Sequence, residues 1–216
     1  TKAITMGAGN DTVTYAGALS TTVGSVGSVA AGTGTADTII MTGAQADAAD
    51  ASSVFNTAFT GFEVLQLSNA MTVTVDLDGV NAANKVILAA GSNGGTINNL
   101  ISGGTVQINA DAAGALAVGI DGAVSRSTDV LNLNLNKSTL LVANTITAAN
   151  VETINITAPD AITALLATGG TTLLGSAAAI NTLGLAATSA TSVVVTGNNG
   201  LTLTNTGNVA ITNFDA

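Results

Sequence analysis

Short apolar segments at a regular interval, separated by glycine- and asparagine-rich turns, are the feature that most limits how this chain can fold. Near the C-terminal end, residues 193–195 (VVV), 201–203 (LTL) and 209–211 (VAI) start eight residues apart. Two turn sequences, 197–200 (GNNG) and 205–208 (NTGN), separate them. Segments this short suit strands, which can stack as a β-solenoid or run as a meander. The sequence leaves both arrangements open.

The rest of the chain follows the same pattern. Between residues 71 and 118 short β-type segments recur, the later ones at about ten-residue intervals. Residues 130–135 (VLNLNL) alternate strictly between apolar residues and asparagine, so one face of that strand is expected to be buried. The chain is 47% hydrophobic but only 2% aromatic, which fits a narrow core of small aliphatic side chains. We predict an all-β, elongated β-solenoid or β-roll-like stack with few or no helices; residues 45–53 suit one or two helical turns.

The 216 residues are expected to form a single β-rich module. Because the chain has no initiator methionine and starts within a motif at Thr1, we expect it to be a segment of a larger protein. Glycine, threonine, asparagine and serine interrupt the apolar residues of 161–190 throughout. They leave no uninterrupted apolar run of about eighteen residues, so we predict that the chain does not span a membrane.

The residue types that are missing exclude several functions. The chain has no cysteine and no histidine, which removes disulfides, thiolate metal sites and the commonest general base. We therefore expect a protein that is not an enzyme. Thirteen acids against four bases give a net charge of −9, so nucleic acid is not an expected partner. The four bases, including Arg126, are isolated in the sequence and are expected to be surface groups or lattice contacts.

Residues 6–14 (MGAGNDTVT) match one unit of the nonapeptide G-G-x-G-x-D-x-U-x, whose repeats coil into a calcium-binding β-roll. Gly7 and Gly9 allow turn conformations that aim backbone carbonyls at one centre, and Asp11 adds a carboxylate. Calcium prefers six to eight such oxygen ligands. Residues 32–40 (GTGTADTII) are a looser copy that contains Asp37. The alternative is an ordinary turn before a strand.

Two segments of the chain resemble each other and each contains an aspartate followed by a glutamate. Residues 35–40 match 127–132, and residues 62–67 match 151–156. We infer an internal repeat, covering about residues 35–70 and 127–160, with a period of about ninety residues.

The four acids of this repeat are candidate metal ligands. Glu63 follows Asp37 by 26 residues, and Glu152 follows Asp129 by 23. Two carboxylates held together repel unless a cation lies between them, so each pair is expected to bind Ca²⁺. The alternative is that each acid ends a strand and faces water.

Several blocks, taken in order, make the chain resemble a known family. They are residues 1–4, 6–14, 61–63, 127–130, 151–153, 194–198 and 203–208. With them, the chain resembles the calcium-dependent, type I-secreted (RTX-like) bacterial surface-layer proteins of the Caulobacter kind. Met6 stands where the nonapeptide has its first glycine, and Ala36 interrupts the second motif.

The resemblance implies a segment of a repetitive β-rich region that binds Ca²⁺ and assembles with its own copies into a two-dimensional lattice. It implies an extracellular location at the cell surface, with lipopolysaccharide as a partner through other domains. Gly7, Gly9 and Asp11 match the nonapeptide's turn glycines and ligand aspartate.

Two other functions share this fold. A calcium-binding adhesin, or an RTX binding module of a large secreted protein, would stay monomeric and bind a glycan or receptor. A polysaccharide-active β-helix enzyme would need a cleft with convergent acids and sugar-binding aromatic or basic residues, which this sequence nearly lacks.

Overall fold

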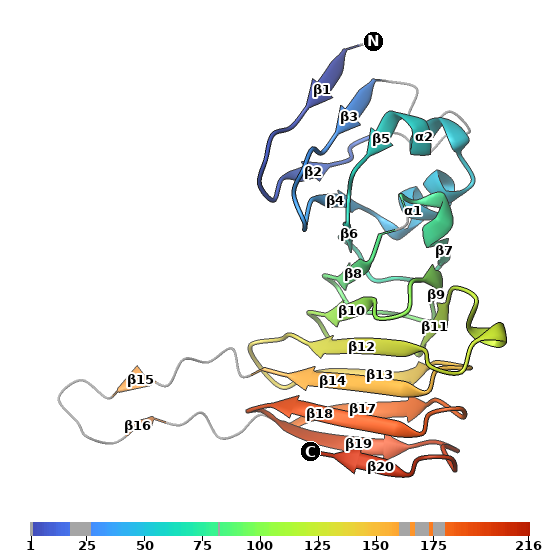
Figure 1. Ribbon diagram of the computed structural model, residues 1–216. Helices are drawn as coiled ribbons and strands as arrows, with labels where there is room; N and C mark the ends of the chain where they lie inside the picture. Colours follow the sequence, from blue (N-terminus) through green and yellow to red (C-terminus); the bar gives the residue numbers. More distant parts are fainter. Residues whose placement is uncertain (1, 18–26, 82, 160–164, 167–172, 175–179) are drawn as a thin grey trace.

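The computed structural model describes residues 2–17, 27–81, 83–159, 165–166, 173–174 and 180–216. It is a β-solenoid of about eight turns built from stacked parallel strands. The N-terminus lies at one end of the stack and the C-terminus at the other (Figure 1). The prediction of an elongated all-β stack is confirmed, and the parallel pairing excludes the meander.

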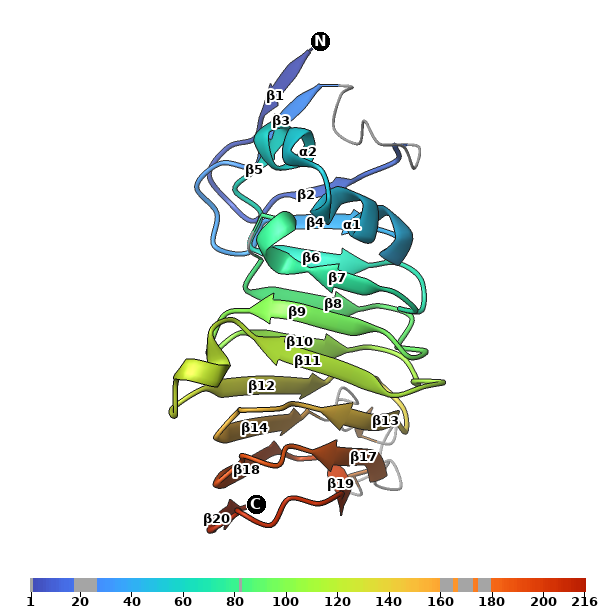
Figure 2. The same cartoon turned by 90° about the vertical axis from the view of Figure 1, so that its right-hand side faces the viewer.

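Two parallel sheets form the body of the solenoid. The first sheet contains, in spatial order, β2 (Thr12–Thr14), β4 (Thr38–Met41), β6 (Val64–Leu67), β8 (Lys85–Leu88), β10 (Thr105–Ile108), β12 (Val130–Leu135), β14 (Thr153–Ala158), β18 (Ser192–Gly197) and β20 (Asn213–Asp215). The second contains, from the N-terminal end, β7 (Thr74–Asp76), β9 (Thr96–Leu100), β11 (Leu116–Ile120), β13 (Val142–Thr147), β17 (Ile180–Ala186) and β19 (Gly200–Asn205). From β7 to β14, strands that follow one another in the chain alternate between the two sheets, which face each other in Figure 2.

Smaller elements complete the described chain. A three-stranded parallel sheet of β1 (Ala3–Thr5), β3 (Ser28–Ala30) and β5 (Phe59–Thr60) lies at the N-terminal end. Strands β15 (Leu165–Leu166) and β16 (Leu173–Leu174) form an antiparallel pair. The helical elements are α1 (Gly43–Asp50), α2 (Ser53–Ala58) and two 3₁₀ turns, η1 (Leu77–Gly79) and η2 (Ala123–Ser125).

The eight-residue interval seen in the sequence is half a coil, so segments at that interval do not pair with each other. Val193 of β18 pairs with Phe214 of β20, and Leu201 of β19 pairs with Asn181 of β17. The prediction that residues 209–211 form a strand is wrong. Asn208 turns the chain there: its Nδ2 donates to the Leu185 carbonyl and its Oδ1 accepts from the Ala187 N–H.

The core consists of rows of buried aliphatic side chains that run along the stack between the two sheets. On the first sheet, register brings together Ile39, Leu65, Val86, Val106, Leu133 and Ile156. All six are buried. On the second sheet, Ile97 pairs with Val75 and Val118 in the same way. Small side chains suffice because only one layer separates the sheets, which explains the scarcity of aromatic residues.

Two short helices lie between β4 and β6 and extend beyond the residues where helical turns were expected. Thr42 and Gln45 form a capping box at the start of α1, and the Ser52 side chain accepts from the Phe55 N–H at the start of α2. Phe55 stacks on Phe59 with ring centroids 4.8 Å apart, and Tyr15 meets both rings edge-on. This aromatic cluster fills the space between the helices and the three-stranded sheet.

Neither helix in the described parts of the chain has the length and apolar character needed to cross a lipid bilayer. Much of the interrupted apolar stretch at residues 161–190 lies outside the described residues.

Candidate metal site

Three acids that precede strands in successive coils lie one above another on one edge of the solenoid. The backbone N–H of Asp11 donates to Oδ1 of Asp37 at 2.7 Å, and the backbone N–H of Asp37 donates to Oε2 of Glu63 at 2.9 Å. The main chain continues the ladder, because Thr38 N–H binds the Asp11 carbonyl and Val64 N–H binds the Asp37 carbonyl. The carboxylates of Asp37 and Glu63 therefore each accept from the backbone amide of the acid in the preceding coil.

The second Asp–Glu pair has the same arrangement. Asp129 N–H donates to Oε2 of Glu152 at 2.8 Å. The predicted repeats contain β4 with β6 and β12 with β14, each a pair of neighbouring parallel strands, while residue 160 lies outside the described part. The structure thus brings together the acids of each predicted pair, with a carboxylate–amide hydrogen bond between them. No group of three or more acids in the described residues is close enough to hold a metal, so other oxygen atoms would have to complete a coordination sphere.

Both aspartates carry a buried oxygen without a partner. Asp37 is 0% exposed and Asp129 is 1% exposed. In each, Oδ1 accepts a hydrogen bond, whereas Oδ2 is buried and makes none within the described residues. Burying a charged oxygen without a hydrogen-bond partner costs up to several kcal/mol of folding free energy. Such an oxygen is therefore expected to have a partner.

Two glycines of the second motif let the first motif and the Asp37 carboxylate pack closely against the chain. A Cβ on Gly34 would lie 2.3 Å from the Gly9 carbonyl oxygen and 2.5 Å from Asp37 Oδ1. A Cβ on Gly32, where φ is +113°, would lie 2.1 Å from the Gly7 carbonyl oxygen. These two glycines therefore let carbonyls of the first motif approach the acidic edge, which a residue with a side chain would prevent.

Gly7, Gly9, Asp11, Asp37 and Glu63, all predicted as site residues, thus lie in three adjoining coils. The Gly7 carbonyl accepts from the Thr33 N–H at 3.3 Å. Sequence reasoning missed Asn10 and Gly34. Asn10 Oδ1 accepts from Thr35 N–H and Ala36 N–H, both at 3.2 Å, and so holds the second motif against the first. The asparagine that precedes Asp11 and the G-x-G of residues 32–34 were the available signals.

The second aspartate differs in having a cation beside it. Arg126 Nε lies 3.0 Å from Asp129 Oδ1, and the arginine side chain is 43% exposed. Arg126 is thus exposed, as expected of a surface group, but it is not isolated, because it pairs with Asp129 as Lys137 pairs with Asp111. Ser102, in the preceding coil, accepts from the Val130 N–H through its Oγ at 3.0 Å.

A separate acidic group lies near the C-terminal end of α1. Asp76 N–H donates to Asp50 Oδ2 at 3.0 Å, and Asn99 Nδ2 donates to both carboxylate oxygens of Asp76. Burial raises the pKa of Asp50 above its usual value, the Asp76 amide lowers it, and the charges of Asp47 and Asp76 raise it further. This cluster offers no unpaired buried oxygen in the described chain, unlike the Asp37 site.

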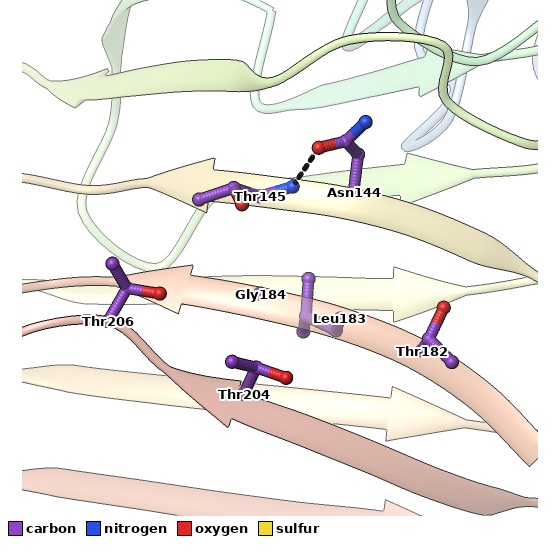
Figure 3. Close-up of a pocket in the computed structure, with 7 residues that line it drawn as sticks. All are labelled: Asn144, Thr145, Thr182, Leu183, Gly184, Thr204 and Thr206. Atoms are coloured by element: carbon purple, nitrogen blue, oxygen red, sulfur yellow. Dashed lines mark hydrogen bonds between the residues drawn. The ribbon is translucent and has the colours of Figure 1, made fainter.

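The outer face of the second sheet carries a shallow pocket of about 260 Å³ near the C-terminal end (Figure 3). Its polar lining consists of Asn144, Thr145, Thr182, Thr204 and Thr206. Gly184 of β17 also lines the hollow and adds no side chain to it. A Cβ on Gly184 would lie 2.7 Å from Thr145 Oγ1 and would fill the space between the hydroxyl groups.

Comparison of the sequence with protein-family models and with curated proteins finds no match. The function of the acidic edge therefore has to be argued from its own geometry.

Proposed function

We propose that this chain is a calcium-binding structural module of a bacterial surface layer, in which Ca²⁺ stabilises the solenoid and copies assemble into a two-dimensional lattice. The observation that carries the calcium part is the buried, unpaired Oδ2 of Asp37. The Asp37 carboxylate and the Gly9 carbonyl oxygen both pack closely against Gly34. A carboxylate and backbone carbonyls are the oxygen ligands that Ca²⁺ prefers.

The charges of the acidic edge support the same proposal. Asp11, Asp37 and Glu63 are consecutive steps of one ladder, and the ion pairs found in the described chain are Arg126–Asp129 and Lys137–Asp111, both elsewhere. A divalent cation would reduce the repulsion between these carboxylates. An ion that binds only the folded chain also stabilises it by mass action. Asp37 with the Gly9 carbonyl would hold the ion; Gly7, Asp11 and Glu63 would shape the loops around it.

The lattice part rests on the sequence resemblance and on the shape of the module. A parallel solenoid is a stiff, elongated unit, which suits a protein whose function is to tile a surface with its own copies. The extracellular location and attachment to lipopolysaccharide through other domains belong to the same proposal.

Two experiments test this proposal: one counts the bound Ca²⁺ ions, and the other looks for two-dimensional arrays of the protein. Native mass spectrometry should find Ca²⁺ on the wild-type chain and one ion fewer on Asp37→Asn, while Asp121→Asn, a change at an exposed turn, keeps the wild-type count. Electron microscopy in millimolar Ca²⁺ should show ordered two-dimensional arrays that EDTA dissolves. A chain that binds no Ca²⁺ would contradict the metal site, and one that binds Ca²⁺ yet stays monomeric would contradict the lattice.

A calcium-binding adhesin is a second candidate, favoured by the threonine-lined pocket in Figure 3. Several hydroxyl groups and an amide around one hollow can exchange hydrogen bonds with a polyol such as a sugar. Under this alternative, the monomer should bind glycans on an array, and Gly184→Val, which fills the pocket, should abolish that binding.

A further inference from the structure

The two acidic steps differ most in charge at one aligned position, three residues before each aspartate. Where residues 35–37 align with 127–129, the residue just before each block is Gly34 in the first and Arg126 in the second. Gly34 carries no side chain, and the Asp37 carboxylate and the Gly9 carbonyl pack directly against it. At the corresponding place in the second step, Arg126 directs its guanidinium group to the Asp129 carboxylate at 3.0 Å.

The loop before Asp129 is built to hold this arginine. Residues 123–125 form η2, with the Arg126 N–H bound to the Ala123 carbonyl and the Ser125 hydroxyl bound to the Gly122 carbonyl. Gly122 has φ of +63°, and a Cβ there would lie 3.4 Å from the guanidinium carbon. The loop protrudes from the stack between β11 and β12 (Figure 2). The arginine is therefore positioned by its own turn.

We propose that Arg126 takes the place of the metal ion at the second acidic step, so that Ca²⁺ binds at Asp37 and not at Asp129 and Glu152. This inference rests on the calcium site proposed above. A guanidinium group carries its charge at every physiological pH and forms directional hydrogen bonds to carboxylates. It neutralises Asp129 without any ligand from solution, and its positive charge repels a second cation.

The consequence is a solenoid with two differently controlled parts. The N-terminal coils depend on the calcium concentration, because no ion pair in the described residues neutralises the charge of Asp37. In the coils from β12 onward, Arg126 balances the charge of Asp129, so these coils do not require Ca²⁺ to fold. Calcium removal should therefore loosen β2, β4 and β6 and leave β12 and β14 unchanged.

Hydrogen exchange on the wild-type chain tests this division without any substitution. Removing Ca²⁺ with EDTA should speed exchange at least tenfold for amides of residues 32–41, while amides of residues 127–135 keep their rates. Equal acceleration in both segments would overturn the inference, because it would mean that the second step also holds calcium. No acceleration in either segment, together with no bound Ca²⁺, would instead overturn the calcium proposal itself.

Substitution provides the second test. Arg126→Gln leaves Asp129 buried without a counter-charge, and native mass spectrometry should then find one Ca²⁺ more per chain than in the wild type. Arg126→Lys keeps a cation and Lys137→Gln removes one from the Asp111 pair, so both should keep the wild-type count. An unchanged count in Arg126→Gln, with wild-type binding at Asp37 intact, would overturn the role of Arg126 alone. If Arg126→Gln does not fold, the exchange experiment decides.

Discussion

The backbone N–H of Asp37 donates to the carboxylate of Glu63, a residue 26 positions later in the chain and one coil further along the solenoid. The amide lies at the turn before β4, where the strand ladder has not yet begun, so it needs an acceptor from the next coil. Glu63 provides that acceptor, as Glu152 does for Asp129.

Removing the acceptor should destabilise the coil before it. Glu63→Ala leaves the Asp37 amide without a partner, at an expected cost of about 1–3 kcal/mol in the free energy of unfolding. Glu63→Gln retains a carbonyl oxygen and should cost less. Urea unfolding followed by circular dichroism measures both, and equal stability of Glu63→Ala and wild type would show that water replaces the carboxylate.

Adding a side chain at Gly34 should disturb the candidate metal site. A Cβ in Gly34→Ala would lie 2.3 Å from the Gly9 carbonyl oxygen, which is backbone and cannot rotate away. We expect a loss of about 1–3 kcal/mol and of calcium binding. Gly119→Ala is the matched control, because Gly119 lies in β11 of the second sheet and a Cβ there comes no closer than 3.4 Å to its neighbours. Calorimetric titration with Ca²⁺ separates the two variants, and normal binding by Gly34→Ala would place the ion elsewhere.

Shortening a side chain in the middle of the buried row on the first sheet should strongly lower the stability of the fold. Leu133 is buried between Val106 and Ile156 of the neighbouring strands. Leu133→Ala should destabilise the chain by about 2–5 kcal/mol, through lost burial and the cavity that remains. The control Val124→Ala removes a side chain that is 88% exposed, and should leave the thermal midpoint within about a degree or two. A small effect for Leu133→Ala would mean that the coils collapse around the gap.

Asp50 should make the stability depend on pH. Its pKa is raised in the folded chain, chiefly by burial, so the folded state holds the proton more tightly than the unfolded state. The protonated group therefore favours folding below its usual pKa of about 4, and this contribution is lost as the pH rises through the raised value. Asp50→Asn should flatten the stability profile over that acidic range, measured by urea unfolding at stepped pH. An unchanged profile would mean that Asp50 is better solvated than the structure indicates.

Much of the architecture could be predicted because local pattern and tertiary packing agree. The strict alternation of residues 130–135 predicted β12, and the Asp–Glu spacing predicted which acids meet, since one coil separates the members of each pair. Residues 209–211 show why the strand pattern failed there. They form a short apolar segment of the kind that predicts a strand, but the side chain of Asn208 binds Leu185 and Ala187, one coil back, and bends the chain.

The candidate site was only partly predictable for a similar reason. Asp37 and Asp129 occupy equivalent places in the sequence pattern, and nothing in the two aspartates themselves distinguishes their environments. The difference lies three residues earlier, at Gly34 and Arg126, and becomes visible only when the loops fold back on the carboxylates. Asn10 escaped notice because a single asparagine has no periodicity to mark it.

The ladder of carboxylate–amide bonds on the acidic edge points one way along the molecule. Asp11 relies on Asp37, and Asp37 relies on Glu63, so each turn is completed by a residue that comes later in the chain. A substitution of Glu63 should therefore destabilise the preceding coil, which contains Asp37, and not the coil that follows. On this edge each coil is therefore stabilised by the coil that follows it in the chain, and the Asp11 turn depends on both later coils.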